Sequence, residues 1–193
     1  MIEDIKEKAL EDGVPIIKDE GLEFLLKTIK DRKAKRILEL GTAVGYSAME
    51  MAKLDKGIHI DTIEKNEDMY LQAKTNVSDA GLDGQISLFF MPIEEFLTDE
   101  MYDLIFVDAA KAQYGKYLEM FLGNMKEDGI MFFDNMVFHG LIYEQESIAS
   151  RSLRSLVRKI NRFREQVHND SRFDIMFYDN IGDGILLLSR RKS

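Results

Sequence analysis

The sequence predicts an α/β protein built on a doubly wound, seven-stranded mixed sheet with helices on both faces. Short apolar runs alternate with longer amphipathic stretches, and a very short turn joins the last two runs. Nearly continuous apolar runs of about four to eight residues are typical of strands that are covered on both faces. The runs that we take as strands are 36–41, 58–64, 86–90, 102–108, 129–134, 173–178 and 184–189.

Helical patterns connect the first five strands, which favours right-handed βαβ units and parallel pairing. The turn at 179–184 is too short to join parallel strands, so the last two strands are expected to form an antiparallel hairpin. Two further helices precede the first strand and are joined across Gly13-Val14-Pro15, and a long one precedes the sixth strand. The predicted helices are 2–11, 20–30, 45–54, 66–80, 92–98, 114–125 and about 148–168.

The chain has 193 residues, of which 45% are hydrophobic and 32% charged, and it shows no repeat or linker. These values predict one globular domain, with N-terminal helices over 1–32 and a core over 33–193. No apolar run approaches the roughly 18 residues that cross a bilayer, and the polar, acidic N-terminus resembles neither a signal nor a transit peptide. The absence of cysteine excludes thiolate chemistry and suits a cytoplasmic protein. A net charge of -9 argues against a general nucleic-acid binder.

A glycine-bracketed turn follows the first strand, and its candidate cofactor-binding residues are Glu39, Gly41, Gly45 and Ser47. Glycine lets the backbone approach a ligand closely, and the following helix start offers N–H groups to an anion. The spacing G-x-x-x-G differs from the G-x-G-x-x-G of dinucleotide sites, which argues against a dehydrogenase and suits the carboxylate of S-adenosylmethionine. Glu64, at the end of the second strand, stands where an acid binds ribose hydroxyls. The alternatives are a plain turn and a surface glutamate.

Polar side chains follow two strands that we expect to be neighbours. Asp108 ends the fourth strand, and Asp134 and Asn135 end the fifth. Ligands of open α/β sheets bind beyond the carboxyl ends of the strands, so these oxygens should meet at one edge. An all-oxygen set favours a hard cation such as Mg²⁺. The alternative is that each Asp caps a following helix.

Lys111 lies three residues beyond Asp108 and is expected over the same site. A nearby dication and exclusion of water lower the pKa of an ammonium group, which lets such a group act as a general base. The alternative is a solvated surface lysine.

The long helix near the C-terminus carries an arginine stripe. Its apolar residues share one face at about 100° per residue, and the opposite face carries Arg151, Arg154, Arg158 and Arg162. In an acidic chain such a stripe suggests a phosphate-bearing partner, and the alternative is a solvated face.

Five segments together resemble the metal-dependent O-methyltransferases of the catechol and caffeoyl-coenzyme A type. They are ILELGTAVGYSA, TIEKNE, FVDAAKAQY, FFDNMVFHG and IGDGILLLS. The VPII segment and the arginine-rich helix are most similar to the bacterial branch that methylates 5-hydroxyuridine at the tRNA wobble position. The resemblance implies a class I, Rossmann-like methyltransferase fold, a homodimer, and S-adenosylmethionine with a divalent metal as cofactors.

The resemblance also implies roles for single residues. Gly41 and Ser47 would hold the methionine part of the cofactor and Glu64 its ribose, while Val14 would touch the cofactor. The metal would be bound by Asp108, Asp134 and Asn135, and Lys111 would be the catalytic base. The family usually has Gly-Asp-Ala beside the adenine, where this chain has Met91-Pro92-Ile93, so a contact there must come from Ile93. The family also usually carries a further N-terminal helical segment.

The expected function is therefore metal-dependent O-methylation of a tRNA hydroxyuridine. The alternative acceptor is a small catechol-like phenol. A non-catalytic nucleotide-binding regulator is the alternative from another class, and the set Asp108, Lys111, Asp134 and Asn135 argues against it.

Overall fold

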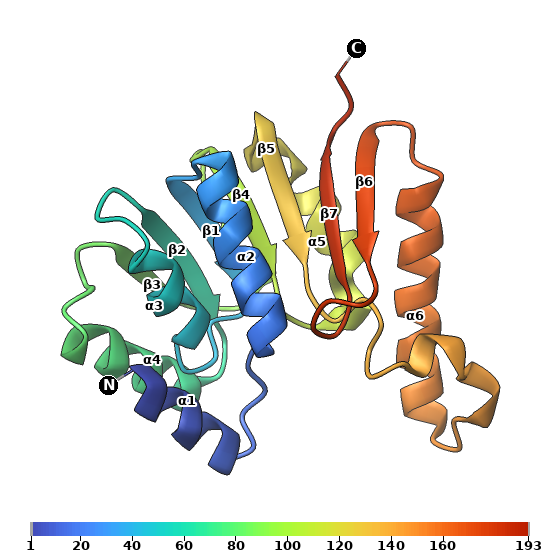
Figure 1. The fold of residues 1–193 in the computed structure, drawn as a ribbon, viewed down its shortest axis with the longest axis horizontal. Coiled ribbons are helices and arrows are strands. Elements are labelled where there is room, and N and C mark those ends of the chain that lie inside the picture. The colour runs from blue at the N-terminus through green and yellow to red at the C-terminus, as the bar shows by residue number, and fades with distance from the viewer. Residues whose placement is uncertain (1, 193) are drawn as a thin grey trace.

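The structure, a computed structural model that describes residues 2–192, contains one seven-stranded sheet in the order β3-β2-β1-β4-β5-β7-β6 (Figure 1). Neighbouring strands among the first five are parallel, and β7 is antiparallel to both β5 and β6. This confirms the predicted mixed sheet with its C-terminal hairpin. The strands are β1 (Arg36–Leu40), β2 (His59–Glu64), β3 (Ile86–Phe90), β4 (Tyr102–Val107), β5 (Met125–Phe133), β6 (Phe173–Tyr178) and β7 (Ile185–Arg190).

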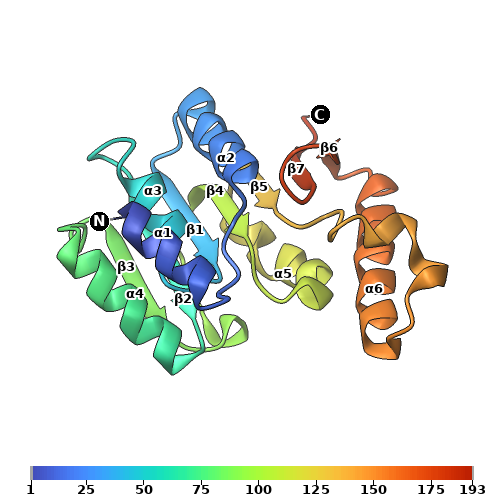
Figure 2. The ribbon, with the colours of Figure 1, turned by 60° about the horizontal axis from the view of Figure 1, so that its bottom comes forward.

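Helices cover both faces of the sheet because successive strand residues point to opposite sides. Ile37 belongs to the apolar cluster beneath α1, α2 and α3, whereas Leu38 belongs to the cluster beneath α5 and α6. Figure 2 shows α1, α2 and α3 apart from α5 and α6, with α4 beside β3. The helices are α1 (Ile2–Glu11), α2 (Asp19–Arg32), α3 (Tyr46–Ala52), α4 (Glu67–Asp79), α5 (Tyr114–Phe121) and α6 (Arg151–His168). No helix within residues 2–192 is long and apolar enough to span a membrane.

The predicted helix over 92–98 is wrong. The segment contains a single 3-10 turn, Ile93–Glu95, after which the backbone of Phe96 is extended. One turn is enough to bury Ile93 and Phe96, while Leu97 stays exposed, and the Phe96 ring packs edge-on against Phe89 with ring centroids 4.9 Å apart. The chain therefore reaches β4 without a further turn of helix.

Three other boundaries differ from the prediction. The helix expected over 114–125 ends at Phe121, and β5 begins at Met125 rather than at 129. The early start of β5 pairs Met125 with Tyr102, ahead of a register shift between these strands. The last helix begins at Arg151, because the Ser150 side chain caps it by accepting from the Leu153 N–H.

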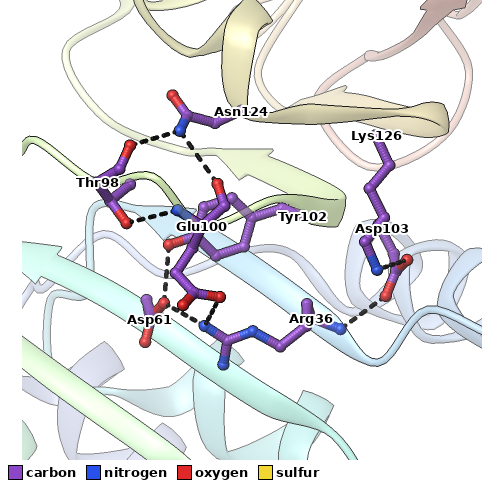
Figure 3. A network of polar contacts seen from close by, with 8 residues as sticks. All are labelled: Arg36, Asp61, Thr98, Glu100, Tyr102, Asp103, Asn124 and Lys126. Carbon is purple, nitrogen blue, oxygen red and sulfur yellow. Dashed lines mark hydrogen bonds and ion pairs between the residues drawn. The ribbon is translucent and has the colours of Figure 1, made fainter.

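A polar network ties together the amino ends of the strands (Figure 3). The Asp61 carboxylate accepts from the Arg36 guanidinium at 2.9 Å and from the Tyr102 hydroxyl at 2.8 Å. The Asp103 carboxylate accepts from the backbone N–H groups of Lys35 and Arg36. Because the five strands are parallel, this network lies at the edge opposite to their carboxyl ends, and we assign it a structural role.

Candidate active site

A cavity of about 300 Å³ lies at the carboxyl ends of β1, β2 and β4. The strand order changes direction between β1 and β4, and ligands of open α/β sheets bind at such a switch point. The wall of the cavity is formed by residues 14–17, the turn after β1, the end of β2, Ile93 with Glu94, and residues 108–111. The predicted site residues that line it are Val14, Gly41, Ser47, Glu64, Ile93, Asp108 and Lys111.

The turn after β1 is held tightly against the segment after β4. Gly41 has a φ of +104°, and a Cβ added there would lie 2.5 Å from the carbonyl oxygen of Asp108. Gly45 also has a positive φ, caps α3, and faces Ala73 of α4 rather than the cavity. Both glycines are therefore required by the backbone, as expected, but only Gly41 lies in the cavity wall.

Glu39 lies beneath this turn and does not line the cavity, which differs from the direct cofactor contact that was predicted. Its carboxyl group is fully buried and accepts from the hydroxyls of Ser47 and Thr62, each at 2.5 Å. Burial raises the pKa of the Glu39 carboxyl to about 7, and the two hydroxyl bonds oppose the rise. We assign Glu39 to holding the turn from behind.

This raised pKa predicts a pH-dependent stability. Between pH 5 and 7 the folded state keeps a proton on Glu39 that the unfolded state has lost, so the free energy of unfolding falls as pH rises. The fall in the free energy of unfolding amounts to up to about 2 to 3 kcal/mol, and Glu39→Gln should abolish it because an amide does not titrate. The variant should still fold, since the amide can exchange one hydrogen bond with each of the two hydroxyls. Urea unfolding from pH 5 to 8 checks this against Glu67→Gln, an exposed control. If the free energy of unfolding changed with pH in the same way for Glu39→Gln and for the unsubstituted protein, the prediction would be contradicted.

The Glu64 carboxylate is fixed in the cavity wall by three backbone N–H groups. Oε2 accepts from Ala43 at 3.0 Å, and Oε1 accepts from Lys65 at 2.9 Å and Asn66 at 2.8 Å. A carboxylate has about four acceptor positions, so a ligand hydroxyl can still be bound. Its ribose-binding role stays a prediction that this geometry allows.

Two carboxyl groups lie close together beyond β4 and β5. Asp134 is 1% exposed, and burial followed by the charge of Asp108 raises the pKa of its carboxyl to about 7. Burial raises the pKa of the Asp108 carboxyl, while the ammonium of Lys111, 3.5 Å away, opposes the rise. Two carboxylates that repel each other in a poorly hydrated place are costly unless a cation joins them.

The comparisons with known proteins agree with this geometry. The sequence profile described as O-methyltransferase matches residues 3–192. The chain belongs to this O-methyltransferase family. The match confirms the predicted family, and with it the enzyme class of an S-adenosylmethionine-dependent O-methyltransferase.

Relatives of this O-methyltransferase include a tapetum-specific methyltransferase from Arabidopsis thaliana. The two sequences are 31% identical over 187 residues, which cover 93% of this chain and 78% of the relative. A candidate caffeoyl-CoA O-methyltransferase from Staphylococcus aureus has a similar structure, with a TM-score of 0.94, 33% identity, and coverage of 98% of this chain and 92% of that one. A methyltransferase from Podospora anserina, solved with SAH bound, gives a TM-score of 0.80 at 26% identity, with coverage of 89% and 78%.

The residues at the carboxyl edge of this O-methyltransferase have the chemistry of a magnesium site. Within residues 2–192, no three His, Asp or Glu side chains converge on one metal position. The predicted set instead has two carboxylates and one amide, from Asp108, Asp134 and Asn135. Mg²⁺ in proteins often takes one or two carboxylates and completes its shell with water or substrate oxygens. The donor set, and the carboxylate repulsion that a cation would relieve, therefore fit the ion.

Two residues that contact the segment after β5 were not predicted as site residues from the sequence. From its residue type, Tyr114 is expected only to pack in the core. In the structure its hydroxyl also donates to the Asp134 carbonyl at 2.8 Å. Asp183, in the turn between β6 and β7, contacts both Asn135 and Lys18. In the sequence, the only signal for Asp183 is an acid between two glycines, and this pattern is also typical of a plain turn. Its burial becomes visible only in the folded chain.

The arginine stripe of α6 is smaller than predicted. Arg151, Arg158 and Arg162 are exposed, and none of them forms an ion pair with another described residue. Arg154 is half-buried, because its Nε donates to the Ile148 carbonyl at 3.0 Å. The first half of α6 extends beyond the carboxyl edge of the sheet (Figure 1), and Lys159 adds an exposed charge.

Proposed function

We propose that this chain transfers a methyl group from S-adenosylmethionine to a hydroxyl oxygen with the help of a divalent cation. The observation that carries the proposal is the pair of largely buried carboxyl groups, Asp108 and Asp134, beside Lys111 at the cavity. The SAH in the related structure from Podospora anserina supports the choice of methyl donor.

The cavity has the size and lining expected for the donor. Its volume of about 300 Å³ lies at the lower end of the range of small-molecule sites. The N–H groups of Gly41 and Thr42 already bond to the Ile63 carbonyl, so an anionic end would meet the first turn of α3 near Ser47. Glu64 is available to a ribose, and Val14 and Ile93 supply apolar contacts.

The cation would be held by Asp108, Asp134 and Asn135. A bound cation would lower the pKa of the hydroxyl group to be methylated, and it would orient that group by also attracting a second oxygen of the same acceptor molecule. Asp134 is fixed for this task, because its Oδ1 accepts from the Asn135 N–H at 2.7 Å and its carbonyl accepts from Tyr114. The acceptor is therefore expected to carry two neighbouring oxygens.

Lys111 is the proton acceptor in this proposal. Its side chain is 21% exposed, lies 3.5 Å from Asp108 and lines the cavity together with it. In its uncharged amine form, the Lys111 Nζ takes the hydroxyl proton and becomes an ammonium. The hydroxyl oxygen forms a bond to the methyl carbon as the carbon–sulfur bond breaks and S-adenosylhomocysteine leaves. Positioning accounts for most of the rate, since the methyl group is already activated by the sulfonium.

We propose 5-hydroxyuridine at the tRNA wobble position as the acceptor. Its hydroxyl stands next to a carbonyl, which provides the two oxygens, and the exposed cations of α6 favour a phosphate backbone on the same side as the cavity. The experiment is a methylation assay that compares tRNA containing 5-hydroxyuridine with a catechol, in the presence of Mg²⁺. Methylation of the catechol alone would overturn the tRNA assignment and leave the chemistry intact.

A small or coenzyme A-linked phenol is the second candidate. Its support comes from the names of relatives such as the caffeoyl-CoA O-methyltransferase of Populus kitakamiensis, which is 29% identical over 187 residues. Those residues cover 92% of this chain and 79% of the relative. The cytoplasmic location and the homodimer both stay predictions. Light scattering on the purified protein tests whether it is a dimer.

The role of α6 gives a prediction of its own. Replacing both Arg158 and Arg162 by Ser should raise the KM for tRNA about tenfold. The slope of log KM against log salt concentration should also fall by about one unit for each phosphate group that the variant no longer neutralises. Replacing Lys30 and Arg32 at the far end of α2 removes the same charge from exposed positions and serves as the control. Equal KM values for both double variants would contradict tRNA docking on α6.

A further inference from the structure

Asp183 is a buried carboxylate at the rim of the carboxyl edge. It belongs to the turn between β6 and β7, and its side chain is 3% exposed. Oδ1 accepts from the His139 backbone N–H at 2.7 Å and contacts the Lys18 Nζ at 3.5 Å. Oδ2 faces the Asn135 Nδ2 at 3.3 Å. Both oxygens are therefore in use, one of them on a residue that we assign to the cation.

The backbone around Asp183 is fixed against the segment that carries Asn135. The Met136 N–H donates to the Gly184 carbonyl at 2.9 Å, and the Val137 N–H donates to the Asp183 carbonyl at 2.8 Å. Gly184 has a φ of +82°, and a Cβ there would lie 2.4 Å from a methyl carbon of Val137. This close contact holds the carboxylate at a fixed distance from Asn135.

A carboxylate decides which end of an amide faces it. An ionised carboxyl group can only accept, so the Asn135 amide must present its N–H₂ to Asp183. The Asn135 oxygen, the end that a hard cation needs, then points away from Asp183. Asn135 also has a φ of +57°, so its backbone stands in the sparsely populated left-handed region, which Asn adopts more readily than most residues.

We propose that Asp183 is a positioning residue that holds the amide of Asn135 with its oxygen toward the divalent cation. This inference rests on the proposed metal site. Partners of metal ligands of this kind commonly contribute about 10- to 100-fold to metal affinity.

The donor and acceptor of this pair can be exchanged, which gives a specific test. In Asp183→Asn the remaining oxygen stays with the His139 N–H, and an N–H₂ group faces the N–H₂ group of Asn135. The Asn135 amide then turns over and offers nitrogen to the cation. Adding Asn135→Asp restores an acceptor opposite Asn at 183 and returns an oxygen to the cation, with the net charge unchanged.

The measurement is the dissociation constant of Mn²⁺ by electron paramagnetic resonance, with S-adenosylhomocysteine present and no acceptor. We expect Asp183→Asn to weaken Mn²⁺ binding 10- to 100-fold in the protein with Asn135, and by less than threefold in the Asn135→Asp background. This coupling is a double-mutant cycle, and a merely structural role of Asp183 would not produce it. Lys18→Met breaks another contact of the same carboxylate and should leave the constant within twofold.

The affinity for S-adenosylhomocysteine and the melting temperature of each variant show whether it is folded. An Mn²⁺ affinity of Asp183→Asn equal to that of the unsubstituted protein overturns the inference and leaves the metal site standing. Equal decreases in both backgrounds overturn it as well, because they assign Asp183 to structure. Failure of the unsubstituted protein to bind Mn²⁺ overturns the proposed metal site and this inference together.

Discussion

Asp134→Ala is expected to reduce the rate of O-methylation by at least about 10³-fold. The change removes one of the two carboxylates that we assign to the cation. Asp134 does not line the cavity, so the dissociation constant for S-adenosylhomocysteine should stay within threefold. Turnover with Mg²⁺ and calorimetry with S-adenosylhomocysteine measure the two quantities separately.

Stability provides an internal check on the same variant. Asp134 is buried beside Asp108, and its raised pKa shows that its charge is unfavourable in the folded protein without a cation. At pH 8 the metal-free variant should therefore melt no lower than the metal-free unsubstituted protein, and added Mg²⁺ should stabilise only the latter. Asp68→Ala, at an exposed position of α4, is the matched control. Full activity of Asp134→Ala in EDTA would end the metal hypothesis.

Lys111→Met is expected to lower kcat by about 10²- to 10⁴-fold, the usual contribution of a general base. The affinity for S-adenosylhomocysteine should change much less than kcat, because methionine keeps the apolar part of the Lys111 side chain in the cavity wall. The pH–rate profile should also lose the limb that reports the base. Lys116→Met is the control, since Lys116 is half-exposed and pairs with Glu94.

Lys111→Arg separates proton transfer from charge. Arginine keeps the positive charge beside Asp108 but does not lose its proton in proteins. We expect this variant to be as slow as Lys111→Met. An Lys111→Arg variant with more than a tenth of the original kcat would show that charge, and not a base, is needed at this position.

The strands were predictable because their signal is local. A strand covered on both faces is typically a nearly continuous apolar run, and β4 and β7 each contain one. Residue types at strand ends were also informative, since parallel strands end at one edge. Asp108 and Asp134 are therefore brought together by topology alone, as Figure 1 makes plain for β4 and β5.

Local periodicity failed where packing against a neighbouring segment decided the outcome. The segment at 92–98 has helical spacing, but two buried contacts close it after one turn. Arg154 has the spacing of an exposed stripe, yet the carbonyl of Ile148 draws it inward. In both cases the deciding partner lies outside the periodic pattern itself.

The sequence by itself determined the order of the elements, the family, and the residue types that meet beyond β1, β4 and β5. The tertiary structure decided what surrounds each of them. It placed Glu39 behind the turn, where burial raises its pKa, and it brought Asp183 from the far end of the chain to Asn135. Apolar burial acts through residue type and period, which a sequence displays. Donor and acceptor pairing acts through angstrom-scale distances between remote segments, and those distances are fixed only when the chain has folded.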